Sequence, residues 1–293
     1  MNIVLTVLGV VAPVAVLAGI GFVWVKRGYE YRMEFVTRLS MTLGVPCLIF
    51  SALMKTEIDP AALAAVSMAA LVGYVTLTVI FWGMTVALDL DRRTYLAPLI
   101  FGNTGNLGLP LALFAFGETG LGFAVVIFAV MALLSFTFGL WLVAGGGSPL
   151  KALREPLVGA TVLGSIFLWQ GWQTPDWVTN TLDLIGQMAI PLMLITLGVA
   201  IARITPRGVG RAVWLSMLRT VICVAIAYLA GRWFGLPPTA LAVLILQLST
   251  PVAVTSYMLA EKYGADAPQV AGLVIISTLM SLITLPLTLV FLI

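Results

Sequence analysis

The sequence predicts an all-α polytopic membrane protein. Of its 293 residues, 61% are hydrophobic and 9% are charged, and the mean hydropathy is +1.12. A soluble domain carries about 25% charged residues, whereas apolar segments here run from end to end. The chain has no histidine, which excludes a Ser-His-Asp hydrolase and removes the commonest metal ligand. We therefore expect a membrane protein that is not an enzyme and has no metal site and no cofactor.

Apolar stretches of about 20 residues predict ten membrane-spanning helices. Lys26 and Arg27 follow the first stretch, whereas a cleavable signal peptide has basic residues before its apolar region, so the first helix is expected to be retained. The ten predicted segments are 3–24, 36–54, 62–88, 95–117, 121–144, 156–172, 178–201, 212–234, 238–261 and 268–292.

The basic residues predict the orientation of these helices. If the N-terminus is outside, every lysine and arginine except Lys55, Arg219 and Arg232 falls in a cytoplasmic loop. This bias satisfies the positive-inside rule. It predicts a protein of the bacterial cytoplasmic (inner) membrane with both termini outside. The net charge of +3 is explained by topology, so the bilayer and not nucleic acid is the expected partner.

A glycine-rich segment divides the chain into two halves of five helices. Residues 1–144 form the predicted first repeat, 145–155 a short cytoplasmic linker and 156–293 the second repeat. Five is odd, so the halves have opposite orientations, as in many transporters. Pro46 and Pro191 lie in similar apolar contexts. Two such prolines can also align by chance, because transmembrane prolines are common.

The fourth and ninth helices carry breakers at their middles. The fourth contains Phe101-Gly102-Asn103-Thr104-Gly105-Asn106-Leu107-Gly108-Leu109-Pro110, and the ninth has Gln247, Ser249 and Thr250 before Pro251. Glycine costs about 1 kcal/mol in a helix interior, and proline removes a donor. An unwound stretch exposes N–H groups and a partial positive charge where the second half-helix begins. The two breaks together predict one anion-binding site, suited to a carboxylate and carrying no formal charge.

Each residue of this predicted site also has a structural interpretation. The three glycines can permit close helix packing. Asn103 and Asn106 can tie the unwound backbone together. Gln247, Ser249 and Thr250 can bond within the ninth helix. Pro110 and Pro251 are interpreted as architectural residues.

The motif Asn103-Thr104-Gly105-Asn106-Leu107-Gly108-Leu109-Pro110 resembles the N-x-G-N-x-G-x-P signature of the auxin efflux carrier family. The segments Thr250-Pro251-Val252-Ala253 and Leu259-Ala260-Glu261-Lys262-Tyr263-Gly264 are similar to the family's ninth helix, and Val45-Pro46 also fits. The resemblance covers essentially the whole chain. The short linker matches bacterial members, whereas plant members have a long hydrophilic loop.

The resemblance implies both a fold and a function. Helices 4 and 9 would cross at the midplane at Pro110 and Pro251, with Asn103 and Asn106 beside a substrate carboxylate. Helices 1, 2, 6 and 7 would form a scaffold that mediates a homodimer. Helices 3–5 and 8–10 would form a moving, elevator-like transport domain. Bacterial relatives are associated with malate, malonate and similar organic anions.

The sequence also bears on what drives transport. Asp183 and Arg219 are the two ionisable candidates inside helices, and each is expected to reach its own membrane surface. A negative interior pushes anions outward by about 2.3 kcal/mol per charge per 100 mV, which favours a potential-driven uniporter that exports anions. The alternatives are sodium or proton symport, as in the related bile-acid carrier architecture, and, outside transport, a receptor. Candidate coupling groups are Gln247, Ser249, Thr250, Ser277, Thr278 and Asp183.

Overall fold

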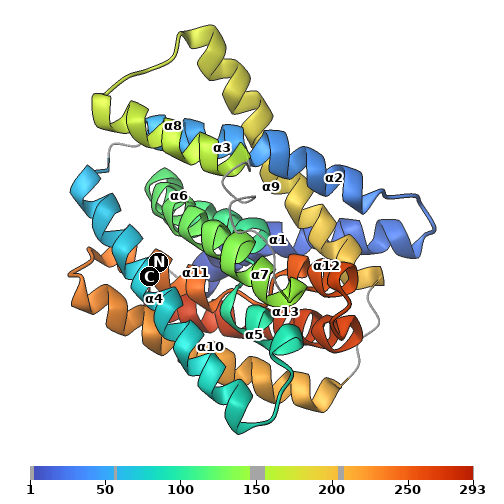
Figure 1. Ribbon diagram of the computed structural model, residues 1–293. Helices are drawn as coiled ribbons and strands as arrows, with labels where there is room; N and C mark the ends of the chain where they lie inside the picture. The colour runs from blue at the N-terminus through green and yellow to red at the C-terminus, as the bar shows by residue number, and fades with distance from the viewer. Residues whose placement is uncertain (1–2, 56–57, 146–155, 204–207, 293) are drawn as a thin grey trace.

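The computed structural model describes residues 3–55, 58–145, 156–203 and 208–292, and every regular element in these ranges is helical (Figure 1). The all-α prediction is confirmed. Residues 146–155 of the predicted linker 145–155 lie outside the described residues. The elements are α1 (Ile3–Lys26), α2 (Met33–Leu39), η1 (Ser40–Gly44), α3 (Val45–Lys55), α4 (Pro60–Ala87), α5 (Arg92–Ile100), η2 (Thr104–Gly108), α6 (Leu109–Leu134), η3 (Ser135–Gly139), α7 (Leu140–Ala144), α8 (Pro156–Gln170), α9 (Asp176–Arg203), α10 (Val209–Trp233), α11 (Pro238–Ser249), α12 (Val254–Tyr263) and α13 (Ala267–Leu292).

Helix ends follow from local chemistry. Asp91 caps α5 by accepting bonds from the N–H groups of Arg93 and Thr94, which satisfies donors that have no partner within the helix. Gly145 and Gly264 end α7 and α12 in the left-handed conformation, which glycine adopts without a Cβ clash. The three η elements are wider π-helical turns inside longer helices. Such turns often occur at functional sites.

Six of the described helical stretches are long and apolar enough to cross a membrane. They are Met33–Lys55, Ala61–Ala87, Thr104–Ala144, Asp176–Arg203, Val209–Trp233 and Ala267–Val290. Shorter apolar helices include Val158–Gln170 and Pro238–Ser249, and the part of α1 from Ala12 to Lys26 is apolar as well. The 41-residue stretch from Thr104 to Ala144 bends at Gly117, whose φ is 63° and ψ −158°. This bend separates the segments predicted as 95–117 and 121–144.

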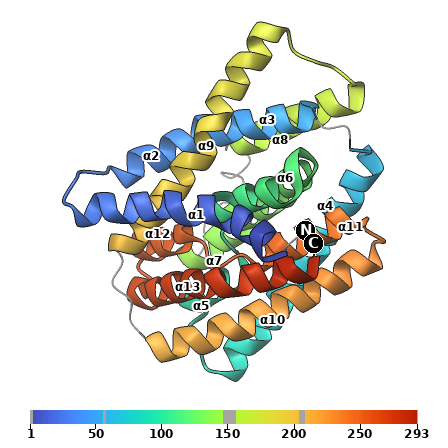
Figure 2. The same ribbon diagram turned by 180° about the vertical axis from the view of Figure 1, so that it is seen from behind.

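One group of helices packs through small residues. The helix α9 lies against α1 and α3, and α3 also packs against α8 (Figures 1 and 2). Gly198 and Gly21 lie directly against backbone atoms across the α1–α9 contact, so a Cβ at Gly198 would be 1.7 Å from the Ala18 carbonyl oxygen. Small residues let membrane helices approach closely. These contacts therefore fix the two helices against each other.

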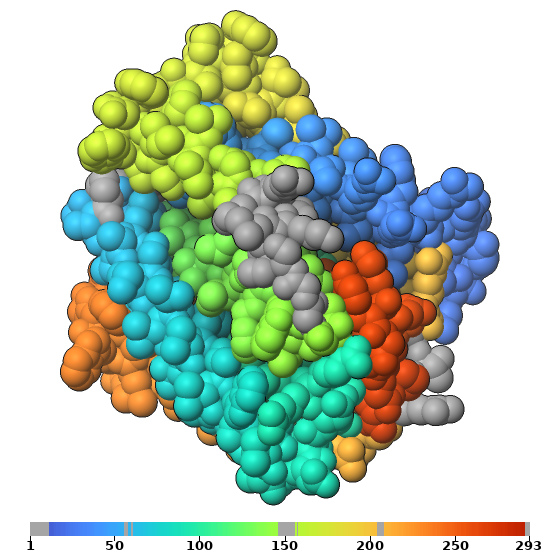
Figure 3. All heavy atoms as spheres, viewed as in Figure 1, coloured from blue at the N-terminus to red at the C-terminus, as the bar shows by residue number. Residues whose placement is uncertain are grey.

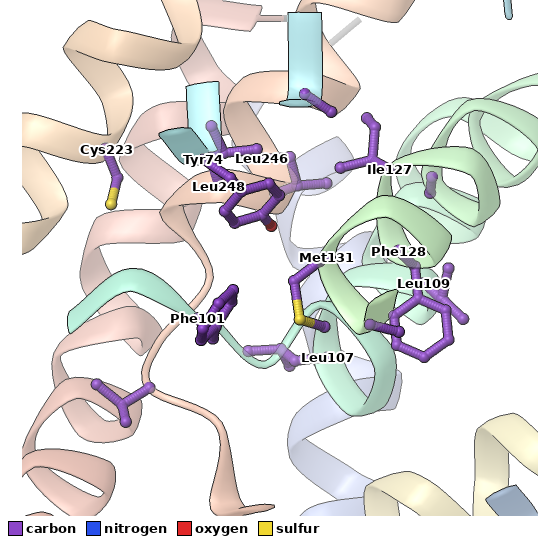
Figure 4. Packing of buried hydrophobic residues seen from close by; sticks show 14 of the residues in the cluster. Tyr74, Phe101, Leu107, Leu109, Ile127, Phe128, Met131, Cys223, Leu246 and Leu248 are labelled. Carbon is purple, nitrogen blue, oxygen red and sulfur yellow. The ribbon is translucent and has the colours of Figure 1, made fainter. Parts of the chain in front are cut away.

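A second group surrounds the two interrupted segments. The helix α10 packs against α4, α11 and α13, while α11 packs against α6. Apolar side chains including Tyr74, Phe101, Leu107, Leu246 and Leu248 fill the space between them (Figure 4). This core holds the ends of four half-helices in place.

The outer surface is apolar. On α4, whose outer side is visible in Figure 3, the side chains of Val75, Val79 and Val86 are more than half exposed. All eight tryptophans are exposed as well, at positions 24, 82, 141, 169, 172, 177, 214 and 233. Such a surface suits hydrocarbon and the aromatic belts at its edges.

Candidate functional site

The two unwound segments cross each other in the middle of the second group. The helix α5 ends at Ile100 and α11 ends at Ser249, and helix resumes at Thr104 and Val254. Between these ends, Gly102 pairs with Val252 in an antiparallel bridge. The Asn103 N–H donates to the Pro251 carbonyl over 2.7 Å. The breaks predicted from sequence therefore meet as one short piece of paired backbone.

The crossing lies at Gly102 and Asn103 and not at Pro110. Pro110 sits in the first turn of α6, where proline is tolerated because the missing N–H would have no partner in the helix. Pro251 does lie in the crossing, where it lacks a donor but contributes its carbonyl. In the first half, glycine and asparagine therefore form the break, and proline starts the next helix.

The three glycines of the motif have different surroundings. Gly102 lies in the crossing, where a Cβ would be 2.4 Å from Thr250 Oγ1 and 3.0 Å from Arg219 Nη2. Gly105 and Gly108 lie in the wide turn η2 instead, against the Phe128 ring and the Gln247 amide. Two of the three glycines thus permit close packing. Gly102 allows the two backbone segments and the Arg219 guanidinium to approach each other.

Asn103 and Thr104 present free polar atoms at the start of η2. The backbone of Asn103 is fully used, because its carbonyl also accepts the N–H groups of Leu107 and Gly108 at 3.1 Å each. Its side chain is only 4% exposed, yet Nδ2 has no hydrogen-bond partner among the described residues. Thr104 Oγ1 is likewise buried without a partner in that part of the chain. Unsatisfied buried polar atoms are costly, so they indicate a ligand or a water.

A small cavity joins the beginnings of both second half-helices. Its volume is about 20 Å³, and it lies between the two helix groups, with room for about one water. Asn106 and Thr255 line it on one side, and Ser40, whose hydroxyl is buried without a partner in the described structure, lines the other. Four methionines complete most of its wall: Met33, Met41, Met193 and Met258. Sequence reasoning missed this opposite wall, because nothing local in 33–41 marks it as facing the break.

The ninth-helix residues divide into free and engaged groups. Gln247 is fully buried, its Nε2 makes a long 3.5 Å contact to the Ala124 carbonyl, and its Oε1 is unpartnered within the described residues. The hydroxyls of Ser249 and Thr250 instead donate back to the Leu246 and Gln247 carbonyls. The interpretation that Ser249 and Thr250 bond within their own helix therefore fits the geometry.

Ser277 and Thr278 lie on α13 beside the crossing. The Ser277 hydroxyl accepts the Val252 N–H at 3.0 Å, so it holds the unwound segment in place. Thr278 Oγ1 donates to the Val274 carbonyl in its own helix at 2.7 Å. Both hydroxyls thus have structural partners.

Arg219 is the principal residue that sequence reasoning misplaced. It is 1% exposed, its Nε donates to the Leu99 carbonyl at 2.9 Å, and its Nη1 donates to the Thr250 carbonyl at 2.6 Å. It was expected to reach the cytoplasmic surface. However, α10 begins at Val209 and not at 212, which puts Arg219 about 15 Å along the helix, near the middle of a ~30 Å hydrocarbon core. The crossing therefore carries a formal positive charge, which corrects the expectation of a neutral site.

Comparison with known proteins finds a matching family and several relatives. Residues 6–149 and 141–289 match the model of the family described as "Membrane transport protein". A Methanothermobacter thermautotrophicus protein named "Uncharacterized transporter" is 29% identical over 94% of this chain and 95% of its own length. A Rhizobium meliloti "Putative malonate transporter" is 24% identical over 86% of this chain and 84% of its own length. A rice "Probable auxin efflux carrier component 5b" is 29% identical over 45% of this chain and 38% of its own length.

The chain belongs to the membrane transport protein family that includes the auxin efflux carriers. It is thus an integral membrane transporter, as the motif around Asn103 predicted.

Asp183 of this transporter lies away from the crossing. Its carboxylate accepts hydrogen bonds from Ser51 and Lys55, and with Lys55 it forms an ion pair between α9 and α3. Both side chains of the ion pair are partly exposed. The pair joins two helices of the first group, and the structure does not bring Asp183 together with the other predicted site residues.

A cavity of about 370 Å³ lies at the end of the transporter where α5, α10 and α13 begin. It is lined by Asp89, Asp91 and Asp266 as well as by Arg93 and Arg211. Three carboxylates counter the two guanidinium groups there. We therefore do not assign the anion site to this cavity.

Proposed function

We propose that this transporter moves small organic anions, of the class of malate, malonate and auxin-like carboxylic acids, across the bacterial cytoplasmic membrane. The observation that carries the proposal is the crossing, where a buried unpartnered amide lies at the start of one half-helix and a cationic side chain binds the backbone of the facing segment. Free N–H groups and the positive helix end attract a carboxylate. A malonate transporter is also the named role of one relative.

We further propose Asn103, Thr104, Gly105 and Asn106, with Gln247, as the groups around the carboxylate. Asn103 and Gln247 have unpartnered amide atoms within the described structure. The small cavity beside Asn106 is lined by methionine side chains, and we propose that the apolar body of the substrate binds on this side once the two helix groups move apart. Methionine adapts to irregular shapes, which fits carriage of several related acids.

For the fold, we propose ten membrane passes in two inverted repeats. Reciprocal packing supports this: α1 of the first half packs on α9 of the second, and α8 of the second packs on α3 of the first. The bend at Gly117 divides the longest of the six stretches into two passes, and α1, α8 and the interrupted α11–α12 segment would supply the other three. Both termini would lie outside.

The two helix groups suggest how access alternates. We assign the scaffold to α1, α2–η1–α3, α8 and α9, and the moving domain to α4–α7 and α10–α13. The small cavity lies between the groups, with Ser40 on one and Asn106 on the other. Sliding one group past the other would expose the site to each side in turn. The scaffold, with exposed residues such as Trp169 and Leu184, is where a homodimer would form.

We propose that the membrane potential drives export without a coupling ion. Arg219 donates to the Thr250 carbonyl, and this fixed positive charge disfavours a sodium ion at Thr250. Sodium or proton symport is the competing mechanism. Gln247 Oε1 is the unpartnered oxygen that most favours a sodium site.

Flux into proteoliposomes containing the full chain tests this proposal. Labelled malonate is loaded on one side, and a potential is set with potassium and valinomycin, in sodium-free and sodium-containing buffers. We expect flux that follows the potential and is the same in both buffers. Flux that needs sodium and ignores the potential would exclude uniport, and no flux for any acid of a malonate, malate and indole-acetate panel would exclude the anion assignment.

A further inference from the structure

Four half-helix ends meet at the crossing, and their partial charges oppose one another. The N-terminal ends of η2 and α12 are positive, and the C-terminal ends of α5 and α11 are negative, each by about half an elementary charge. With equal numbers of each sign, the crossing itself has no net preference for an anion over a cation. Something else must decide which sign the site favours.

Arg219 lies at both negative ends. Leu99 belongs to the last turn of α5 and Thr250 is the C-cap of α11, and the carbonyls of both accept bonds from the same guanidinium. The side chain is buried, and none of its described contacts is a carboxylate. Among the described residues its charge is therefore met by the carbonyl ends of two half-helices, and its Nη2 is buried without a hydrogen-bond partner.

The matching position of the other half is neutral. Tyr74 of α4 precedes Arg219 by the same 145 residues that separate Pro46 from Pro191. Its ring lies beside Phe101 at the crossing, 6.1 Å between centroids, on a helix that packs against α10, the helix of Arg219. Its hydroxyl is buried without a partner in the described part of the chain. One half thus contributes a cation and the other a phenol.

We propose that Arg219 is the residue that makes the crossing anion-selective. By neutralising the negative ends of α5 and α11, it leaves the positive ends of η2 and α12 as the net field at Asn103 and Asn106. It is a positioning residue that acts through the field and through both backbone segments. This inference rests on the proposed anion transport and specifies what sets the sign of the site.

A matched pair of Tyr74 variants tests the charge while leaving Arg219 in place. Tyr74→Glu puts a carboxylate beside the guanidinium and cancels its charge, whereas Tyr74→Gln has nearly the same shape without the charge. We expect malonate affinity of the purified full chain to fall at least tenfold in Tyr74→Glu and to stay within threefold of wild type in Tyr74→Gln. Equal affinities in the two variants would overturn the proposal.

Substitutions of Arg219 itself give a second readout. Arg219→Met should lose malonate binding at least tenfold, and Arg219→Lys, which keeps the charge with fewer fixed donors, should recover part of the loss. If Arg219 only holds the two backbone segments in place, Arg219→Lys and Arg219→Met should lose malonate affinity equally. That result would also overturn the proposal. If Arg219→Met does not fold, the Tyr74 pair decides. Failure of the wild type to bind any carboxylate would instead refute the proposed function.

Discussion

At the scale of single residues, the informative atoms are the buried polar atoms that have no hydrogen-bond partner among the described residues. The backbone of Asn103 forms hydrogen bonds at the crossing, and its side-chain amide nitrogen has no partner among the described residues. The hydroxyls of Ser249 and Thr250 instead donate to carbonyls of their own helix. The sequence makes all three look alike, as polar residues in an apolar helix. Only the hydrogen-bond inventory separates a candidate ligand from a local cap.

The asparagines give the most direct test at this scale. Losing a hydrogen bond to a charged group costs about 1.5–3 kcal/mol, so Asn103→Ala should weaken malonate binding about tenfold to a hundredfold, and Asn106→Ala should do the same. Isothermal titration of the purified protein measures this. Asn180→Ala, an exposed asparagine of α9, is the matched control. Unchanged affinity in both motif variants would remove these residues from the site.

Asp183 should prove structural and not coupling. Its pair with Lys55 is partly exposed, so Asp183→Asn should lower the free energy of unfolding by less than about 1 kcal/mol. We expect malonate flux at pH 6 and at pH 8 to match wild type within twofold. Asp176→Asn in the same helix is the control. A pH dependence that disappears only in Asp183→Asn would assign a proton to this carboxylate.

At the scale of elements, glycines decide how closely helices approach. Gly198→Ala would push a Cβ to 1.7 Å from the Ala18 carbonyl and force α1 away from α9, which we expect to cost about 1–3 kcal/mol. Gly19→Ala, also in α1, is the control, because no atom lies within 4 Å of the Cβ that this substitution adds. Thermal unfolding in detergent compares them. Equal unfolding midpoints for the two variants would mean that the α1–α9 contact accepts the added methyl group without loss of stability.

The breaks show how far sequence reasoning reaches. It found both interrupted helices, because glycine, proline and amides are costly in an apolar helix. It placed the first crossing at Pro110, because a proline that starts a helix and a proline that breaks one have the same surroundings in the sequence. It also missed the depth of Arg219, since a helix beginning three residues earlier moves a side chain from near the surface to the midplane. The wall formed by Ser40 and the methionines depends on tertiary packing and left no local signal.

At the scale of the whole molecule, the tryptophans mark two membrane interfaces. Trp24, Trp82, Trp141 and Trp214 lie near helix ends at one set of loops, and Trp169, Trp172, Trp177 and Trp233 lie near those of the other. All are exposed. Two aromatic belts with four members each are what a bilayer with two interfaces favours.

Cysteine labelling tests the orientation directly. In a chain with Cys47→Ala and Cys223→Ala, a cysteine at Gln173 should react with a membrane-impermeant maleimide on intact cells. A cysteine at Glu30 should react only after permeabilisation. Both sites are exposed loop residues, so they are matched in accessibility. The reverse pattern would place the N-terminus inside.

The methionines around the small cavity have a consequence for the cell. Met33, Met41, Met193 and Met258 come from both helix groups, and their unbranched thioethers can change shape as one surface moves over the other. Oxidation turns a methionine into a polar, chiral sulfoxide, which reductases can reverse. If the two groups slide as proposed, oxidative stress would slow the transporter at this contact, and repair of the sulfoxides would restore the proposed flow of anions without new synthesis.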